Sequence, residues 1–289
     1  MMLSPNEILE LRSLAETAAK EAGALIQKST QKTQKVEHKE GADSFAAQVV
    51  TEVDRVCEAL IRERFTDSQE KYDVAFLGEE TEDDGQRHQK DYFWCVDPLD
   101  GTLAFTERTP GYAVSIALVS NSGMPMLGVV FDPVNDVLYS AAHQRGAQRN
   151  GERLWVKEDT NLLTVPCDRS LVARDDFESI RRTFDKWSAL ENLQGVQYIH
   201  NAGAVMNALW TIESPPACYF KFPKSQQGGG SLWDFAATAC IVQEAGGHVC
   251  DFEGNSLDIN RRDSTYMNHR GAIYSTRREL VLICQQLRL

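Results

Sequence analysis

Several patterns that would assign this chain to a special structural class are missing from it. Its seven cysteines are odd in number and scattered, and no two of them form a Cys-x-x-Cys pair. This arrangement predicts reduced thiols and argues against a disulfide framework or a zinc cage. No apolar run approaches the roughly 18 residues of a membrane span, and the N-terminus lacks a basic segment followed by an apolar one. We therefore expect a cytoplasmic protein that does not associate with membranes.

Positive charge is also scarce in the chain. Lysine and arginine total 30 residues against 42 aspartates and glutamates, which gives a formal net charge of −12. Nucleic-acid polymers and acidic membrane surfaces need a basic face, so neither is expected as the main partner. A small phosphorylated ligand remains compatible with this charge, provided that something cationic neutralises its site.

The chain does have enough length and apolar content for a large core. It contains 289 residues, of which 42% are hydrophobic. We predict an N-terminal α+β half over residues 1–156, with an antiparallel meander at 112–156, and a C-terminal α/β half over residues 157–289. A sheet-rich segment followed by alternating strands and helices predicts two sheets with helix layers between and outside them.

Local patterns predict the elements of each half. The capping box at Ser4 begins a helix that reaches about Ile26, and a polar, non-periodic stretch at 29–48 follows it. We interpret this stretch as a mobile loop, either a solvated connection or a lid over a site. A second helix is predicted at 49–65. Further strands are predicted at 73–77, 92–96, 171–173, 196–200, 217–222, 248–252 and 272–275, and further helices at 203–210, 234–245 and 277–287.

The most informative motif is Asp97-Pro98-Leu99-Asp100-Gly101-Thr102, which follows a strongly apolar strand. Two carboxylates at the end of a buried strand repel each other unless a cation lies between them. Hard oxygen ligands of this kind suit Mg²⁺. If a helix begins at Gly101-Thr102, its first N–H groups would bind an anion beside the metal. The competing interpretation is a structural Asp-Pro turn with a capping Asp.

A different class of phosphatase shares part of this motif. The haloacid-dehalogenase superfamily uses Asp-x-Asp-Gly-Thr, in which the first Asp is the covalent nucleophile. Here the residue two positions before Asp100 is Pro98, and Asp97 stands three positions before it. We reject this alternative because the spacing differs by one residue.

Three further acidic residues are candidates for the same site. Glu79 follows a predicted strand and could reach the same cation, although an exposed charged turn fits equally well. Asp54 in Thr51-x-x-Asp54 could activate a nucleophile, but a capping box at the start of the second helix is the favoured interpretation. Asp234 precedes an apolar helix as a natural N-cap, which is compatible with metal binding. The glycines at 228–230 lack the Gly-Lys-Ser/Thr continuation of a P-loop and are interpreted as a flexible turn.

The order of these motifs resembles the inositol monophosphatase superfamily. Gly-Glu-Glu, Asp-Pro-Leu-Asp-Gly-Thr, and Trp-Asp before a helix that ends in Glu-Ala-Gly-Gly carry the resemblance, which runs from residue 50 to residue 247. Members are Mg²⁺-dependent, lithium-sensitive phosphatases and include 3′(2′),5′-bisphosphate nucleotidases. The resemblance implies a layered α-β-α-β-α sandwich of the inositol monophosphatase and fructose-1,6-bisphosphatase type, and a homodimer.

The resemblance also implies a role for each motif residue. Two Mg²⁺ ions, or three if Glu79 reaches another through water, would be held by Glu79, Asp97, the backbone carbonyl of Leu99, Asp100 and Asp234. The implied catalytic residues are Asp54, Thr102 and Glu79. Asp54 and Thr102, with support from Thr51, would orient and deprotonate the water that attacks phosphorus in line, without a phosphoenzyme.

Substrate recognition is the least determined part of the resemblance. The implied substrate contacts are Asp100, Gly101, Thr102, Gly203, Ala204, Lys221 and Asp234. Inositol monophosphatases use a Glu shortly before the Trp-Asp motif to contact sugar hydroxyls, and Lys221 takes its place here. A cation suits a second anionic group better than a hydroxyl, whereas a lysine on a solvated loop is the alternative interpretation.

These inferences lead to one expected function and several alternatives. We expect a phosphomonoesterase that acts on a small phosphorylated polyol. The first alternative is a 3′(2′),5′-bisphosphate nucleotidase that acts on 3′-phosphoadenosine 5′-phosphate. Fructose 1,6-bisphosphatase and histidinol phosphatase activities also remain open. The alternative from another class is a non-catalytic homologue that binds metal or phosphate.

Overall fold

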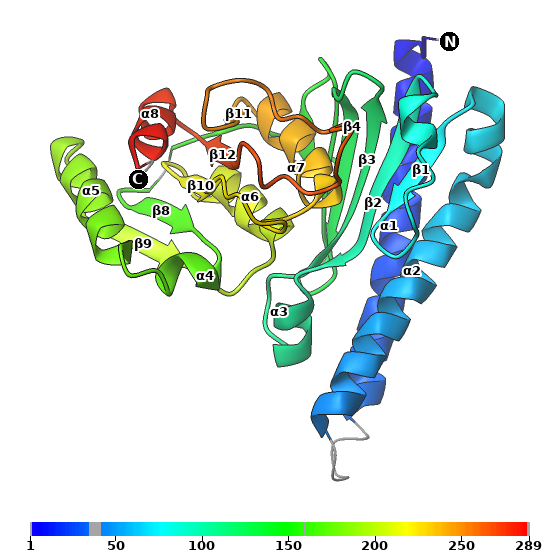
Figure 1. The fold of residues 1–289 in the computed structure, drawn as a ribbon, viewed down its shortest axis with the longest axis horizontal. Helices are drawn as coiled ribbons and strands as arrows, with labels where there is room; N and C mark the ends of the chain where they lie inside the picture. Colours follow the sequence, from blue (N-terminus) through cyan, green and yellow to red (C-terminus); the bar gives the residue numbers. More distant parts are fainter. Residues whose placement is uncertain (1, 35–41, 159, 288–289) are drawn as a thin grey trace.

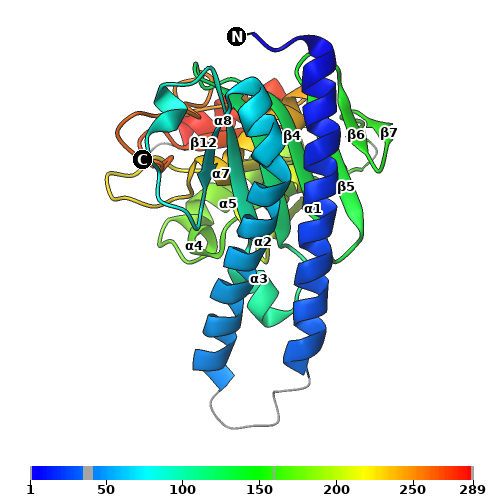
Figure 2. The same ribbon diagram turned by 90° about the vertical axis from the view of Figure 1, so that its right-hand side faces the viewer.

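The computed structural model describes residues 2–34, 42–158 and 160–287 and arranges them in five alternating layers (Figure 1). The first layer is a pair of long neighbouring helices, α1 (Pro5–Gln34) and α2 (Ala42–Tyr72), shown face-on in Figure 2. The second layer is a seven-stranded sheet, and the third contains the helices α6 and α7. The fourth layer consists of smaller sheets, and the outer helices α5 and α8 form the fifth. The predicted α-β-α-β-α sandwich is confirmed.

The large sheet is formed by consecutive strands in chain order. Its members are β1 (Ala75–Gly78), β2 (Tyr92–Asp100), β3 (Ala113–Ser120), β4 (Pro125–Asp132), β5 (Val137–Ala142), β6 (Ala147–Arg149) and β7 (Glu152–Leu154). β1 is parallel to β2, and every later pair is antiparallel, which confirms the meander. All nine residues of β2 are buried, because helices cover both faces of the sheet. The boundary between halves at residue 156 stays a prediction.

The middle layer contains α6 (Ala204–Glu213) and α7 (Leu232–Glu244). α7 packs closely on β4, where a Cβ added to Gly128 would lie 2.2 Å from the carbonyl oxygen of Ala237. A side chain at position 128 would therefore push this helix away from the sheet. The helix carries Asp234 in its first turn, so this close packing also fixes the height of that residue above the sheet.

The smaller sheets lie on the other side of α6. One is antiparallel, in the order β10 (Cys218–Lys221), β12 (Ala272–Ser275) and β11 (His248–Cys250). The other pairs β8 (Leu163–Pro166) in parallel with β9 (Val196–Ile199), and a bridge between Thr164 and Ala217 joins the two. The remaining helical elements are η1 (Gln86–His88), α3 (Thr102–Glu107), α4 (Arg169–Val172), α5 (Phe177–Leu190) and α8 (Arg278–Gln286).

The expected loop at residues 29–48 is wrong over most of its length. α1 continues to Gln34, and α2 begins at Ala42 and ends at Tyr72, well outside the predicted limits of 49–65. Residues 35–41 lie outside the described residues. The C-terminal end of α1 and the N-terminal end of α2 extend beyond the sheet (Figure 2), and the sequence shows no apolar periodicity there. The described segments 29–34 and 42–48 nevertheless contain several Gln, Lys and Ala residues, which have good helix propensity.

The region after β8 is also more helical than predicted. Residues 171–173, expected as a strand, lie at the short helix α4 and its end. α5 was not predicted, although Ile180, Phe184 and Trp187 recur at helical spacing and are buried in the core of the C-terminal half. A three-residue apolar segment is too short to distinguish a strand from a helical turn by periodicity.

Two findings bear on the absences noted in the sequence. Within the described ranges, no helix combines the length and apolarity needed to cross a bilayer. All seven cysteines are free thiols, and six of them are buried.

Candidate active site

The end of β2 supplies two carboxylates to one point in the structure. The pairing of β2 with β3 shifts register between Asp97 and Asp100, so the strand is irregular between them. The Leu99 N–H donates to Oδ1 of Asp97 over 3.0 Å, which fixes that carboxylate beside the chain. Asp97 is 1% exposed and Asp100 is 8% exposed.

Asp100 also anchors the C-terminal half of the chain. Its carboxylate accepts hydrogen bonds from the N–H groups of Ala204 at 3.2 Å and Val205 at 2.9 Å, in the first turn of α6. Gly203 makes this approach feasible, because a Cβ there would lie 2.1 Å from Oδ2 of Asp100. Ala204, predicted to contact substrate, thus directs its N–H toward Asp100.

Asp234 is supplied by the first turn of α7. The predicted N-cap role of Asp234 is wrong, because Ser231 is the N-cap and Asp234 is three residues further on. The Ser231 N–H donates to Oδ2 of Asp234 over 2.7 Å, as in a capping box. This contact uses one oxygen and leaves the other facing β2.

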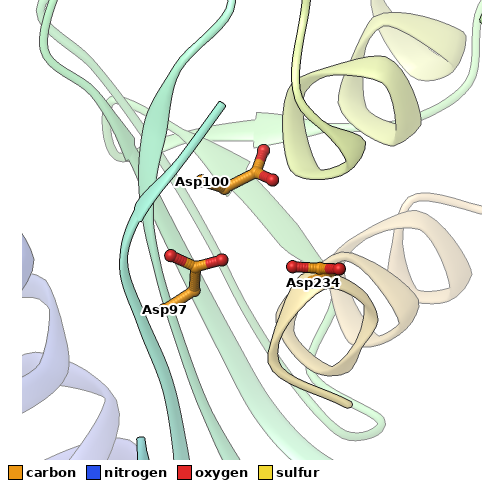
Figure 3. A group of neighbouring side chains, drawn as sticks. All are labelled: Asp97, Asp100 and Asp234. Atoms are coloured by element: carbon orange, nitrogen blue, oxygen red, sulfur yellow. The ribbon is translucent and has the colours of Figure 1, made fainter. Parts of the chain in front are cut away.

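The three aspartates converge although they come from a strand and a helix far apart in the sequence. Each offers one carboxylate oxygen, and these oxygens all lie within 4.8 Å of one another (Figure 3). The pKa values of Asp97 and Asp100 are raised well above the ordinary range, mainly because both residues are buried and also because other carboxylates lie nearby. Three buried carboxylates this close need a cation between them or must take up protons. An all-oxygen donor set of this kind fits a hard divalent cation such as Mg²⁺.

Glu79 lies beside this cluster at the end of β1. It remains accessible to solvent and is not one of the three residues whose oxygens converge. Partial desolvation and the charge of Asp234 raise the pKa of Glu79 to about 7, against the effect of a hydrogen bond with Asp97. Glu79 therefore contacts the aspartate cluster and borders its opening.

α2 contributes two more carboxylates, Asp54 and Glu58. The capping-box interpretation of Thr51 and Asp54 is wrong, because α2 begins at Ala42 and both residues lie inside it. Asp54 is 5% exposed, and its Oδ1 atom has no hydrogen-bond partner in the described part of the chain. Burial, followed by the charges of Glu79, Glu80 and Glu58, raises the pKa of Asp54 to about 8.

Glu58 was not identified from the sequence, although it follows Asp54 by four residues on the same helix face. Its carboxylate accepts the Glu80 N–H at 2.8 Å and the Thr81 hydroxyl, which holds the turn after Glu79. Gly78 leaves room for it, since a Cβ there would lie 2.2 Å from Oε2 of Glu58.

A cavity of about 310 Å³ adjoins the aspartate cluster, and all seven predicted substrate contacts line it. Gly101 adopts a φ of +85° directly before α3, where a Cβ would lie 2.6 Å from the carbonyl oxygen of Gly111. The N–H groups of Gly101 and Thr102 donate to no residue that the structure describes. The cavity thus combines carboxylates at one end with unused N–H donors.

Lys221 lies in the wall of this cavity. The solvated-loop interpretation is wrong, because Lys221 ends strand β10 and its side chain is 15% exposed. Its Nζ lies 3.2 Å from Oδ2 of Asp168, and Oδ1 of Asp168 accepts hydrogen bonds from the Asn207 amide and the Tyr219 hydroxyl. Although burial opposes the charged form, Asp168, Asp234 and Asp100 together raise the pKa of Lys221. Asp168 had no signal in the sequence.

Comparison with known proteins places this fold among solved inositol monophosphatases. The inositol monophosphatase from Anabaena (Nostoc) sp. PCC 7120 matches with a TM-score of 0.68 and 23% identity, over 97% of each chain. The layered sandwich is thus the inositol monophosphatase fold.

Sequence comparison identifies the family. The Inositol monophosphatase family model matches residues 7–288. "Inositol monophosphatase 1" of Solanum lycopersicum is 32% identical over 253 residues, covering 86% of this chain and 87% of the relative. "Nus factor SuhB" of Escherichia coli K12 is also 32% identical, over 84% of this chain and 85% of the relative. The chain therefore belongs to the inositol monophosphatase family, a family of metal-dependent phosphomonoesterases.

Proposed function

We propose that this protein is a Mg²⁺-dependent phosphomonoesterase that hydrolyses a small phosphorylated polyol to the free alcohol and inorganic phosphate. The observation that carries the proposal is the convergence of Asp97, Asp100 and Asp234 beside a cavity with unused N–H donors. Water supplies the oxygen that joins phosphorus, and the alcohol oxygen leaves with a proton. No covalent phosphoenzyme is needed.

The acidic cluster would hold two Mg²⁺ ions, or three if Glu79 reaches another through water. Asp97, Asp100, Asp234, Glu79 and the carbonyl of Leu99 are the proposed ligands. When bound, Mg²⁺ neutralises the phosphate, lowers the pKa of the attacking water and stabilises the leaving oxygen. The unpartnered Oδ1 of Asp54 and the mutual repulsion of the aspartates support a cation site here.

The remaining residues position the reactants. We assign phosphate binding to the N–H groups of Gly101 and Thr102, which have no other acceptor among the residues described. Asp54, with Thr102, orients the attacking water and accepts its proton. A buried carboxylate with an unpaired oxygen is suited to this role, since general bases work best with a pKa near the working pH.

Lys221 favours a second candidate, a 3′(2′),5′-bisphosphate nucleotidase. Its ammonium is paired with Asp168, so it adds positive charge to the wall of the cavity, beside a second anionic group, without itself binding that group. One relative is named a Nus factor and not a phosphatase, so the alternative from another class is a non-catalytic homologue. A homodimer in the cytoplasm stays a prediction.

The proposal is tested with Asp97→Asn and a panel of substrates. Inositol 1-phosphate, 3′-phosphoadenosine 5′-phosphate, fructose 1,6-bisphosphate and histidinol phosphate are assayed with and without Mg²⁺ and Li⁺. We expect Mg²⁺-dependent phosphate release that Li⁺ inhibits and that Asp97→Asn abolishes, with an unchanged circular dichroism spectrum. Near-normal turnover by the variant would refute the assignment, and no turnover of any ester by the wild type would favour the non-catalytic alternative.

A further inference from the structure

The loop between β10 and α7 carries a second lysine and three consecutive glycines beside the proposed active site. Gly228, Gly229 and Gly230 have φ values of 109°, 81° and 93°, a region that side-chain-bearing residues rarely adopt. Gly230 lines the cavity next to the aspartate cluster, and a Cβ there would lie 2.6 Å from Oδ2 of Asp234. The loop thus runs directly over the site.

A second cavity of about 240 Å³ adjoins the first and shares Asp168 and Lys221 with it as a common wall. Gly229 and Lys224 line this second cavity. The glycine loop therefore passes from the cavity that would hold the ester phosphate to a neighbouring one. A substrate bound in the first cavity would extend its alcohol part toward the second.

The second cavity carries an excess of positive charge. Lys221, Lys224 and Arg174 line it, with Asp168 as the one acidic lining residue. The ammonium of Lys221 is paired with Asp168 at 3.2 Å, and the guanidinium of Arg174 is paired with Asp176 at 2.7 Å. Lys224 is exposed and has no carboxylate partner in the described ranges. It is therefore the cation in this cavity that is available to a ligand.

The glycine loop places backbone donors next to that cation. A Cβ on Gly228 would lie 3.1 Å from Nζ of Lys224, and one on Gly229 would lie 3.2 Å from its Cε. The glycines thus allow the lysine to lie along the loop. The N–H groups of Gly228 and Gly229 donate to no residue in the part of the chain described. Two successive N–H groups without an acceptor, close to an ammonium, are suited to binding an anion.

We propose that Lys224 and the N–H groups of Gly228 and Gly229 bind a second anionic group, a phosphate or a carboxylate, on the alcohol part of the substrate. The inference rests on the proposed function, because it requires the ester phosphate to lie at Gly101 and Thr102. Lys221 does not hold this anion. Its ammonium is bound to Asp168 and forms the wall between the two cavities.

The test compares matched pairs of esters that differ in the second anion. 2-Phosphoglycerate is compared with glycerol 2-phosphate, and 3′-phosphoadenosine 5′-phosphate with adenosine 3′-monophosphate, at saturating Mg²⁺. The measured quantity is the ratio of kcat/KM within each pair. We expect a preference of about tenfold or more for the ester that carries the second anionic group in at least one pair, the size of one charge-assisted contact. The preferred pair identifies the anion as carboxylate or phosphate.

Three variants locate the source of that preference. Lys224→Gln is expected to bring the ratio close to one, mainly by raising KM for the ester with two anionic groups. Lys221→Gln is expected to retain the preference. Lys186→Gln, on the exposed side of α5, removes a lysine that lines neither cavity and controls for the change in net charge. The unfolding temperature of each variant shows that it is folded.

The outcomes separate this inference from the proposed function. A ratio near one for both pairs in the wild type, or a preference lost in Lys221→Gln but retained in Lys224→Gln, overturns the assignment. If no ester is hydrolysed, the proposed function fails. The loop is then tested by equilibrium binding of 3′-phosphoadenosine 5′-phosphate, which Lys224→Gln should weaken about tenfold or more; equal affinity overturns the inference.

Discussion

Asp54 and Glu58 lie one turn apart on α2 and are both buried, yet their surroundings differ. Glu58 accepts hydrogen bonds from the Glu80 N–H and the Thr81 hydroxyl, and glycine at position 78 leaves space for it. Asp54 has an oxygen without any partner among the described residues and a pKa raised to about 8. The fold thus provides hydrogen-bond donors for the carboxylate of Glu58 but leaves one oxygen of Asp54 without a donor among the described residues.

This difference separates structural from functional use of the same residue type. A buried polar group without a partner destabilises the fold, so its retention indicates that a ligand, proton or ion completes it. Glu58 needs no such completion and holds the turn that presents Glu79. The same helix face thus supplies Glu58, which holds the turn after Glu79, and Asp54, which we propose as the general base.

The largest expected effect that sharpens this contrast is the loss of activity in Asp54→Asn. Removal of a general base lowers kcat by about 10²–10⁴-fold. The unfolding temperature in the absence of metal should not fall, because the substitution removes a buried carboxylate that has an oxygen without a hydrogen-bond partner. Steady-state kinetics and thermal unfolding measure the two effects. Wild-type turnover by this variant would show that Asp54 is not the base.

Glu58→Ala should show the opposite profile. It leaves the Glu80 N–H and the Thr81 hydroxyl without their acceptor, which lowers the free energy of unfolding by about 1–3 kcal/mol. Activity at saturating Mg²⁺ should fall far less than in Asp54→Asn. Urea unfolding of Glu58→Ala, with Glu58→Gln as the conservative control, measures the change. Equal stability of Glu58→Ala and the wild type would contradict the structural role.

The smallest effect is a pH dependence of the metal-free protein. The folded pKa of Asp54 is about 8, whereas an unfolded Asp titrates near about 4. Between these values the folded state binds more protons than the unfolded state, so the free energy of unfolding decreases as pH rises. This group contributes at most about 1.4 kcal/mol per pH unit.

Thermal unfolding with a chelator at pH 6 and pH 8 tests this sign. The unfolding temperature should be lower at pH 8, and Asp54→Asn should show a weaker dependence than the wild type. Glu58→Gln serves as the comparison. It neutralises a second carboxylate on the same helix face, one that already accepts hydrogen bonds from Glu80 and Thr81. A wild-type slope equal to that of Asp54→Asn would show that Asp54 does not contribute.

The features predicted from the sequence were those encoded over a few residues. The carboxylates of Asp97 and Asp100 are separated by two residues at a strand end, and α7 is indicated by the apolar run after Asp234, although its N-cap is Ser231 and not Asp234. The strands of the meander were predicted from their turns. The order of the motifs, through the family resemblance, predicted that Asp234 lies beside Asp97 and Asp100. The local sequence around Asp234 does not by itself indicate this.

The features that were missed depend on tertiary packing. Asp168 matters because Asn207, Tyr219 and Lys221 surround it, and none of these is near it in sequence. Lys224 acquires its role from the cavity beneath the glycine loop. The helical segments on either side of residues 35–41 carry no apolar periodicity in the sequence, so the sequence pattern predicts a loop where the structure has helix.

The proposed cation site takes its carboxylates from both β2 and α7, which has a consequence for biosynthesis. Asp234 is translated more than 130 residues after Asp100, so a nascent chain that has just completed the large sheet has only part of the cage. An ion that binds only the finished cage stabilises the finished protein by mass action and leaves the earlier nascent chain unaffected. If the proposed site holds Mg²⁺, the ion would therefore stabilise the protein only after the last third of the chain has docked.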